Sequence, residues 1–209
     1  ELPRPGGEGK ALKTSAPPME FPIYLATLSP KSLELTGEIA DGWIGTSFMP
    51  EHADVFFDSI RKGAAAAGRT LADIDLQAAG GVVQFGDDLE EMIPPRKPGL
   101  AFSMGAMGSK QHNFYNAAYR RAGYADEGAQ IQRLYLEGKR DEATALVTDE
   151  MVTQTNLLGT EQMIRERIRV HRAAGVNTLR VQPSGGSFAE RLETLGRVVQ
   201  MVKEVSAEA

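Results

Sequence analysis

The sequence predicts an α/β protein of four parallel βα units, which corresponds to half of a TIM-type (β/α)8 barrel. Short apolar runs alternate with amphipathic helical patterns along the 209 residues. Such alternation leads to parallel strand pairing with right-handed crossovers, in either an open doubly wound sheet or a barrel. A complete barrel has eight strands in typically about 250 residues, twice the strands found in this pattern. With helices on one face only, this four-stranded sheet would leave its other face bare. That bare face must meet another surface, because parallel sheets are normally covered on both faces.

The first unit follows residues 1–21, a segment rich in Pro, Gly and Lys that we interpret as a connection. Pro22–Leu28 is a short apolar run of the kind that forms a strand buried on both faces. Ser29 is a favoured N-cap and Pro30 a favoured first helical residue, which predicts a helix from Pro30 to about Ala40. The buried face of this helix should carry Leu33, Gly37 and Ala40.

The second unit has a strand at Asp41–Ser47 and a helix that Pro50 opens and Gly68 ends. Apolar residues recur in that helix at the spacing of one buried face, namely Ala53, Phe56, Phe57, Ile60 and Ala64. The third strand is expected at residues 75–85 and contains the pair Gly80-Gly81. Glycine inside a strand indicates a bulge or the close approach of another group, either a ligand or a neighbouring helix.

Residues 88–158 form a mostly helical insertion in this interpretation, an enlarged crossover after the third strand. The fourth unit begins with a helix that Thr160 caps and Gly175 ends, and continues with a strand at Val176–Gln182. Ser187 and Glu190 have the spacing of a capping box for the last helix. We expect the apolar stripe of this helix to comprise Phe188, Leu192, Leu195, Val199 and Val202. The chain 1–209 is therefore treated as one domain.

Composition excludes several classes of function. The net charge is −5 and the sequence has no dense basic run, which argues against nucleic acid and acidic membranes as partners. It contains no cysteine, so disulfides, thiolate catalysis and iron–sulfur clusters are excluded. This composition fits a reducing compartment, and we expect a soluble cytoplasmic protein. The start at Glu1 has no signal-peptide pattern, and we expect a chain entered in the middle, such as a processed product or a fragment.

Ligands of parallel α/β folds bind at the carboxyl ends of the strands, which makes the loops there the candidate sites. The loop Thr27–Lys31 places a hydroxyl, a lysine and free amides at a helix N-terminus, which suits either a phosphate or a simple helix cap. Gly185 and Gly186 occupy the position of the phosphate site found after late barrel strands, or form a tight turn that needs no ligand. The loop Gly45–Met49 is expected to pack, with pocket lining as the alternative.

The three histidines are too scattered in the sequence to suggest a metal site. His171 shares a helical face with apolar residues, which predicts partial burial and no catalytic role. His52 and His112 are weak candidates for proton transfer, and the catalytic residues remain unknown at this stage. The sequence has no H-E-x-x-H, P-loop or G-x-S-x-G motif.

Three separate segments resemble the luciferase-like oxidoreductases, and they are most similar to the branch that uses the deazaflavin coenzyme F420. The first runs from Pro22 through Lys31 and Leu35-Thr36-Gly37-Glu38-Ile39-Ala40-Asp41-Gly42-Trp43, and resembles the fifth and sixth strand units of that family. The segment Pro5–Lys13 resembles what precedes that strand. The third comprises Asn113-Phe114-Tyr115-Asn116 and Gln130–Leu136, within the insertion.

The resemblance implies that the chain holds strands five to eight of a (β/α)8 barrel. It also implies that the loop after the fifth strand contributes to the cofactor's phosphate site, here Ala26, Thr27, Leu28, Ser29 and Lys31. The family usually has Gly where Ser29 stands, and Ser loses freedom at positive φ, which could favour a different cofactor. The implied activity is hydride transfer between F420 and a small organic substrate.

Two alternatives stay open on the sequence. One is an FMN-dependent monooxygenase of the same family, for which the departure at Ser29 is the support. The other is a non-catalytic half-barrel module. In each case we expect a missing N-terminal half-barrel, or a second copy in a homodimer, to complete the sheet, because unpaired edges and a bare face favour association. Without that half the chain should be inactive.

Overall fold

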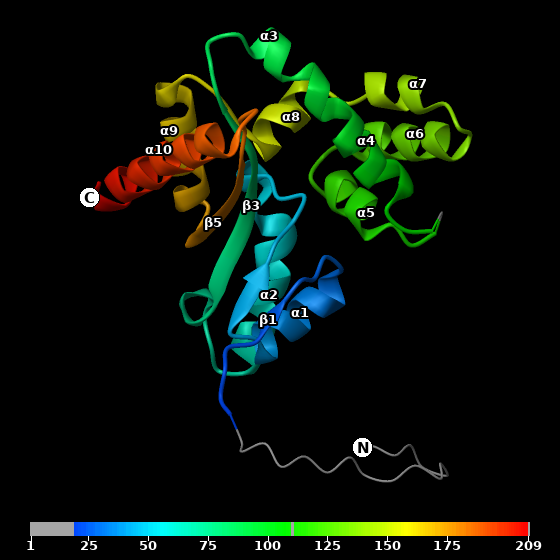
Figure 1. Ribbon diagram of the computed structural model, residues 1–209. Coiled ribbons are helices and arrows are strands. Elements are labelled where there is room, and N and C mark those ends of the chain that lie inside the picture. The colour runs from blue at the N-terminus through cyan, green and yellow to red at the C-terminus, as the bar shows by residue number, and fades with distance from the viewer. Residues whose placement is uncertain (1–18, 110, 209) are drawn as a thin grey trace.

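The computed structural model describes residues 19–109 and 111–208 and contains a five-stranded sheet in which every pairing is parallel (Figure 1). The predicted α/β class with parallel strands is therefore confirmed. The segment Pro5–Lys13 and most of the connecting segment lie outside the described residues. The strands are β1 (Tyr24–Leu25), β2 (Gly42–Ile44), β3 (Asp75–Phe85), β4 (Leu157–Gly159) and β5 (Thr178–Pro183).

β3 is the central strand and pairs with three neighbours along its length. It pairs with β2 at its start, with β5 along its middle and with β4 at its end. Gln77 pairs with both β2 and β5, and Val83 with both β4 and β5, so β2 and β4 share one edge of β3. β4 was not expected. It lies at the end of the predicted insertion 88–158, and its three residues are too few to show a strand pattern.

The helices follow the expected order, and three begin at the expected caps, whereas Pro50 opens a short 3-10 helix and the second α-helix starts at Asp54. Ser29 accepts a hydrogen bond from the Ser32 amide, Thr160 accepts one from the Met163 amide, and the Ser187–Glu190 capping box is formed. The helices are α1 (Pro30–Ile39), α2 (Asp54–Ala66), α3 (Leu89–Met92), α4 (Lys97–Ala106), α5 (Phe114–Arg121), α6 (Ala125–Leu136), α7 (Arg140–Ala145), α8 (Asp149–Thr155), α9 (Glu161–Ala173) and α10 (Phe188–Ala207), with short 3-10 helices η1 (Pro50–His52), η2 (Leu71–Asp73) and η3 (Pro94–Arg96). None of the described helices is long and apolar enough to span a membrane.

The two faces of the sheet differ in chemistry. One face, which we call the helix-covered face, is apolar and packs on the buried stripes of α1, α2, α9 and α10. Its strand residues include Trp43, Leu76, Ala78, Val83 and Leu157. The other face, which we call the open face, is largely polar. Its residues are assigned from the strand register, since residues paired in register point to the same side. Its residues include Tyr24, Asp75, Gln77, Thr178, Arg180 and Gln182.

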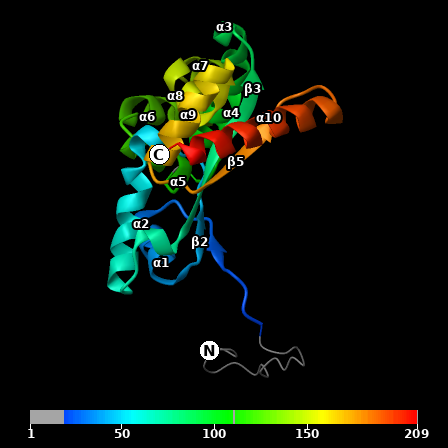
Figure 2. The ribbon, with the colours of Figure 1, turned by 90° about the vertical axis from the view of Figure 1, so that its left-hand side faces the viewer.

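The insertion helices lie beside the carboxyl-terminal part of β3, as both views show (Figures 1 and 2). Their side chains form a core of their own. Leu158 of β4 belongs to this core, together with Met104, Tyr119, Ile131 and Met151. The insertion therefore covers the far end of the open face, while the part near β1 stays uncovered.

Two burial predictions are wrong. Pro22–Leu28 is not buried on both faces: Ile23 is 53% exposed, because β1 is an edge strand beside the uncovered part of the sheet. On α10 most of the expected stripe is turned outward, with Phe188 74% and Leu192 57% exposed, whereas Val202 packs against the core. Val198, Met201 and Val205 fill the core instead. The expected stripe and the buried set of α10 residues both have helical spacing, so only the packing of the helix on the sheet decides which of them is buried.

Candidate active site

A cavity of about 360 Å³ lies on the open face, between the carboxyl-terminal part of the sheet and the insertion helices. This edge of a parallel sheet is where barrel enzymes hold their ligands. The volume is at the small end of the range for ligand pockets. The described residues that line it are Thr46, Ser47, Phe48, Ala79, Gly81, Val82, Pro95, Arg96, Gly99, Leu100, Ser103, Tyr119, Thr155, Asn156 and Gln182.

The floor of the cavity is a bulge in β3 at the glycine pair. The register with β5 shifts between Ala79 and Val82, and Gly81 has φ +65°. A Cβ at Gly81 would stand 2.0 Å from the Thr155 carbonyl oxygen, so no side chain fits there. The Asn156 side-chain oxygen accepts a hydrogen bond from the Val82 amide at 2.9 Å, which satisfies a group that the bulge removes from the ladder. Of the alternatives left open for Gly80-Gly81, the structure shows the bulge.

The loop after β2 serves packing and cavity lining together, so both interpretations of Gly45–Met49 hold in part. Phe48 and Met49 are buried in the cores, whereas Thr46, Ser47 and one side of Phe48 line the cavity. Ser47 has φ +51°, the only positive φ of a described residue other than glycine. Such a conformation costs of order 1–3 kcal/mol and is typical of ligand sites.

The roof of the cavity is fixed by two buried asparagines of the segment that carries the family resemblance. Asn113 caps α5 and donates to the Met104 carbonyl at 2.9 Å. Asn116 donates to the same carbonyl at 3.0 Å and to the Gly128 carbonyl at 2.7 Å. These bonds join α4, α5 and α6, and they hold Tyr119 of α5 over the cavity.

Two polar atoms at this cavity are buried without a hydrogen-bond partner in the part of the chain that the structure describes. They are the Tyr119 hydroxyl and the Arg96 Nε. Arg96 is held by its Nη2, which donates to the Gln84 side chain at 2.7 Å. Burial raises the pKa of Tyr119 well above its usual range, and hydrogen bonding toward the Ser47 side chain opposes this shift, so the phenol keeps its proton. Sequence reasoning missed both residues, since neither belongs to a motif.

The predicted phosphate loop after β1, residues 26–31, which we call the lip, is tied to its surroundings by hydrogen bonds. The Thr27 hydroxyl bonds that of Thr36 at 2.7 Å, and the Thr27 carbonyl accepts from the Trp43 indole at 3.0 Å. The Ser29 hydroxyl caps α1. Lys31 is exposed. Arg121 of α5 donates to the Leu28 carbonyl at 3.0 Å, which brings a second cation to the lip.

The lip and the cavity are separate places that share α5 as a wall. Tyr119 extends from this helix to the cavity and Arg121 extends to the lip. None of Ala26–Ser29 or Lys31 lines the cavity. Their role as cofactor-binding residues therefore stays a prediction.

Gly185 and Gly186 follow the end of β5, where the Ser184 amide donates to the carbonyl of Val83 near the carboxyl end of β3. They therefore lie closer to that end of β3 than the lip does. The Gly186 amide donates to the Glu190 carboxylate at 2.7 Å, and the Gly185 carbonyl accepts from Arg191. The capping carboxylate thus occupies an amide that a phosphate would need. A ligand role for this turn also stays a prediction.

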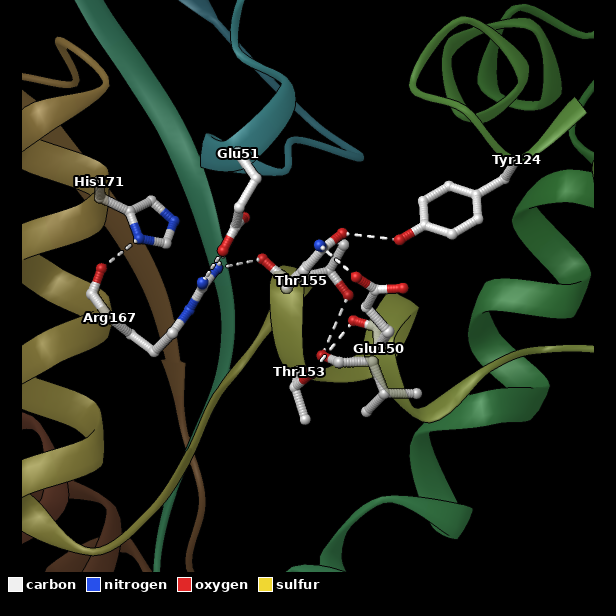
Figure 3. A network of polar contacts seen from close by, with 9 residues as sticks. Glu51, Tyr124, Glu150, Thr153, Thr155, Arg167 and His171 are labelled. Atoms are coloured by element: carbon white, nitrogen blue, oxygen red, sulfur yellow. Dashed lines mark hydrogen bonds and ion pairs between the residues drawn. The ribbon is translucent and has the colours of Figure 1, made fainter.

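The histidines have different surroundings. His171 is only 2% exposed, so it is more deeply buried than the sequence predicted. Its Nδ1 is hydrogen-bonded with the Arg167 carbonyl at 2.8 Å (Figure 3). Burial lowers its pKa. Arg167 pairs with Glu51 and donates to the Gln154 carbonyl at 2.9 Å, so the group joins α9 to η1 and α8. This network stabilises packing between helices.

On the other side of that network Tyr124 donates to the Gln154 side chain at 2.9 Å (Figure 3). Burial and then the charge of Glu150 raise the pKa of Tyr124 to about 12. The His52 ring packs edge-on against Tyr124. His112 is exposed, and neither histidine lines the cavity.

Comparison with known proteins decides the family. Residues 2–178 match the profile of the luciferase-like monooxygenase family. The chain belongs to this family. The predicted membership is therefore confirmed. A Mycobacterium tuberculosis protein named as a coenzyme F420-dependent oxidoreductase is 34% identical over 197 residues, which cover 92% of this chain and 56% of that protein. A 5,10-methylenetetrahydromethanopterin reductase of Methanopyrus kandleri is 29% identical over 202 residues, 92% of this chain and 56% of the relative.

Solved structures agree on the fold. The coenzyme F420-dependent tetrahydromethanopterin reductase of Methanopyrus kandleri superposes with a TM-score of 0.64 at 26% identity, covering 88% of this chain and 50% of that one. An F420-dependent secondary alcohol dehydrogenase, solved with an F420–acetone adduct, has a TM-score of 0.55 at 16% identity, covers 92% of this chain and 52% of that one, and is similar in fold alone. The chain spans about half the length of the relatives it matches.

Proposed function

We propose that this chain is the cofactor-binding half of a coenzyme F420-dependent oxidoreductase that transfers a hydride between the deazaflavin and a small organic substrate. The observation that carries the proposal is the similarity, over 92% of the chain, to a protein named as F420-dependent. The geometry supports it: a cationic lip and a small cavity lie at the carboxyl ends of neighbouring strands and share α5.

The lip has the chemistry that a phosphate-bearing cofactor needs. Lys31 and Arg121 supply positive charge there, and the N-terminus of α1 adds its dipole. Arg121 remains available for further bonds, since one of its five N–H groups holds Leu28. In the proposal these groups orient the cofactor, and the deazaflavin supplies the hydride chemistry.

We further propose that the open face and free edges of the sheet pair with the remaining half of a luciferase-like barrel. Within the described chain β1 pairs with β2 alone and β5 with β3 alone, which leaves an edge at each end. Phe188, Leu192, Leu195 and Val199 form an exposed apolar stripe on α10 next to the β5 edge. A partner of four βα units is favoured because the relatives are about twice as long as the matched region.

The cofactor proposal is tested by fluorescence titration of F420 and of FMN. The sample is the 209-residue chain, alone and mixed with the part of the Mycobacterium tuberculosis relative that it does not match. Saturable quenching of F420 in the mixture, with FMN binding at least tenfold weaker, supports the proposal. Tighter binding of FMN would favour the flavin-dependent monooxygenase, and no binding of either would favour a non-catalytic module.

Two variants make this titration specific for the lip. Lys31→Ala should weaken F420 binding several-fold, because it removes a charge opposite the phosphate. Lys62→Ala is the matched control, since this exposed lysine lies on α2 and its charge is paired with Glu34. Equal effects of the two substitutions would contradict a phosphate site at Lys31.

Association with the second half is measured on the same mixture by sedimentation. Leu192→Lys on the exposed stripe should abolish the complex, whereas Glu193→Lys on the neighbouring exposed position should leave it intact. A stable homodimer of the chain alone, which Leu192→Lys disrupts, would replace the proposed partner by a second copy.

A further inference from the structure

We infer that the cavity under the insertion binds the carboxylate group of a small organic acid, with Arg96 and Tyr119 as the residues that recognise it. The inference deepens the proposed function, since it names the class of substrate that the oxidoreductase would take. It is carried by the unpaired donors, the charge balance and the shape of this one cavity.

The first argument is the pair of buried donors without acceptors. Tyr119 is 0% exposed, and its hydroxyl makes no hydrogen bond within the described residues, although the Ser47 side chain lies close enough to lower its pKa. The Arg96 Nε is buried and has no partner there either. A buried polar group without a partner costs roughly 1–3 kcal/mol, and more when it is charged. Two such groups at one cavity indicate that a ligand supplies the acceptors.

The second argument is charge. Arg96 is the only residue with a charged side chain among the described residues that line the cavity, and it has no carboxylate partner in the described chain. Its Nη2 donates to the neutral Gln84 side chain, and its Nε is buried without a partner in the described residues. A guanidinium with a free Nε–H side matches the two oxygens of a carboxylate.

The third argument concerns the protonation of Tyr119 and the remaining lining. Because burial keeps the phenol protonated, Tyr119 can donate to an oxyanion. The remaining lining is mixed, with the apolar Phe48, Val82 and Leu100 beside polar residues that include Ser103 and Gln182. The cavity of about 360 Å³ therefore suits the carboxylate end of a small organic acid.

The test uses the full 209-residue chain and benzoate as the probe, with benzamide as its uncharged isostere and phenyl phosphate as a second anion. Binding is followed by NMR chemical-shift changes. The inference expects saturable binding of benzoate, at least tenfold tighter than that of benzamide. Tighter binding of phenyl phosphate than of benzoate would overturn the choice of a carboxylate, and absence of benzoate binding would overturn the site.

Substitutions separate recognition from structure. Tyr119→Phe should weaken benzoate binding on the order of tenfold, since it removes a hydrogen bond to a charged group. The same change should keep or raise the melting temperature, because it removes an unpaired buried hydroxyl. Tyr115→Phe on the same helix is the control. A loss of melting temperature without a loss of binding would assign Tyr119 a structural role and end the inference.

Arg96→Lys provides an independent variant that keeps the charge and removes the Nε–H. We expect it to weaken benzoate binding about tenfold, while Arg120→Gln, an exposed cation on α5, has no effect. Failure of F420 to bind the lip in the titration above, together with intact benzoate binding, would remove the oxidoreductase proposal and leave the carboxylate site. The reverse result would remove only the carboxylate site.

Discussion

The lip and the cavity lie on either side of α5, and they differ in how their polar groups are used. At the lip the Thr27 carbonyl and hydroxyl and the Ser29 hydroxyl all have partners within the chain. At the cavity the Tyr119 hydroxyl and Arg96 Nε have none among the described residues. The lip is thus complete as a piece of folded structure, whereas the cavity leaves hydrogen-bonding capacity for a ligand.

This difference shows that a loop rich in polar residues does not necessarily leave hydrogen-bonding groups free for a ligand. The lip has the polar residues that a binding loop should have, yet most of them stabilise the entry into α1. Its capacity for an anion comes from Lys31 and from Arg121, which is 90 residues away in the sequence. The cavity draws its donors from η3 and α5, two elements of the insertion, and neither Arg96 nor Tyr119 belongs to a motif.

The largest expected effect tests how firmly the lip is tied to the core. Trp43 is fully buried among Phe48, Phe56 and Phe57, and its indole N–H donates to the Thr27 carbonyl. Trp43→Ala should lower the free energy of unfolding by about 3–5 kcal/mol. Urea titration followed by circular dichroism measures this. Trp43→Phe keeps most of the packing and should cost clearly less, and equal losses would mean that packing contributes little.

The second effect tests the floor of the cavity. Gly81→Ala should lower the free energy of unfolding by about 2 kcal/mol or more, because φ is positive and the Thr155 carbonyl oxygen leaves no room. Gly99 also lines the cavity, but a Cβ there meets nothing within 4 Å. Gly99→Ala should therefore be neutral or stabilise by up to about 1 kcal/mol. Similar melting temperatures for the two variants would contradict the bulge geometry.

The smallest effect tests whether Ser29 acts as a cap. Ser29→Ala should cost about 1 kcal/mol of stability, since the Ser32 amide loses its acceptor. Ser29→Asp should restore that stability, because Asp is an equally good N-cap. If the lip also binds a phosphate, Ser29→Asp should weaken F420 binding through like-charge repulsion while the protein stays stable. Thermal melts and the F420 titration together separate the two roles, and full stability of Ser29→Ala would exclude the cap.

Much of the fold could be read from local pattern. The caps at Ser29, Thr160 and Ser187 and the stripe on α2 are local features, and each was found where the sequence indicated. The parallel pairing followed from the alternation of strands and helices. β4 could not be foreseen, since its three residues become a strand only through pairing with the end of β3.

The sequence by itself determined the family, the order of βα units, the glycine pair that allows the bulge and the cation of the lip at Lys31. The tertiary structure decided which face of α10 is buried, which groups at the lip are already bonded, and that Arg96 and Tyr119 meet at one cavity. The physical reason is range. Caps and turns depend on neighbours within a few residues, whereas burial and unpaired donors depend on elements that lie far apart in the chain and meet only after packing.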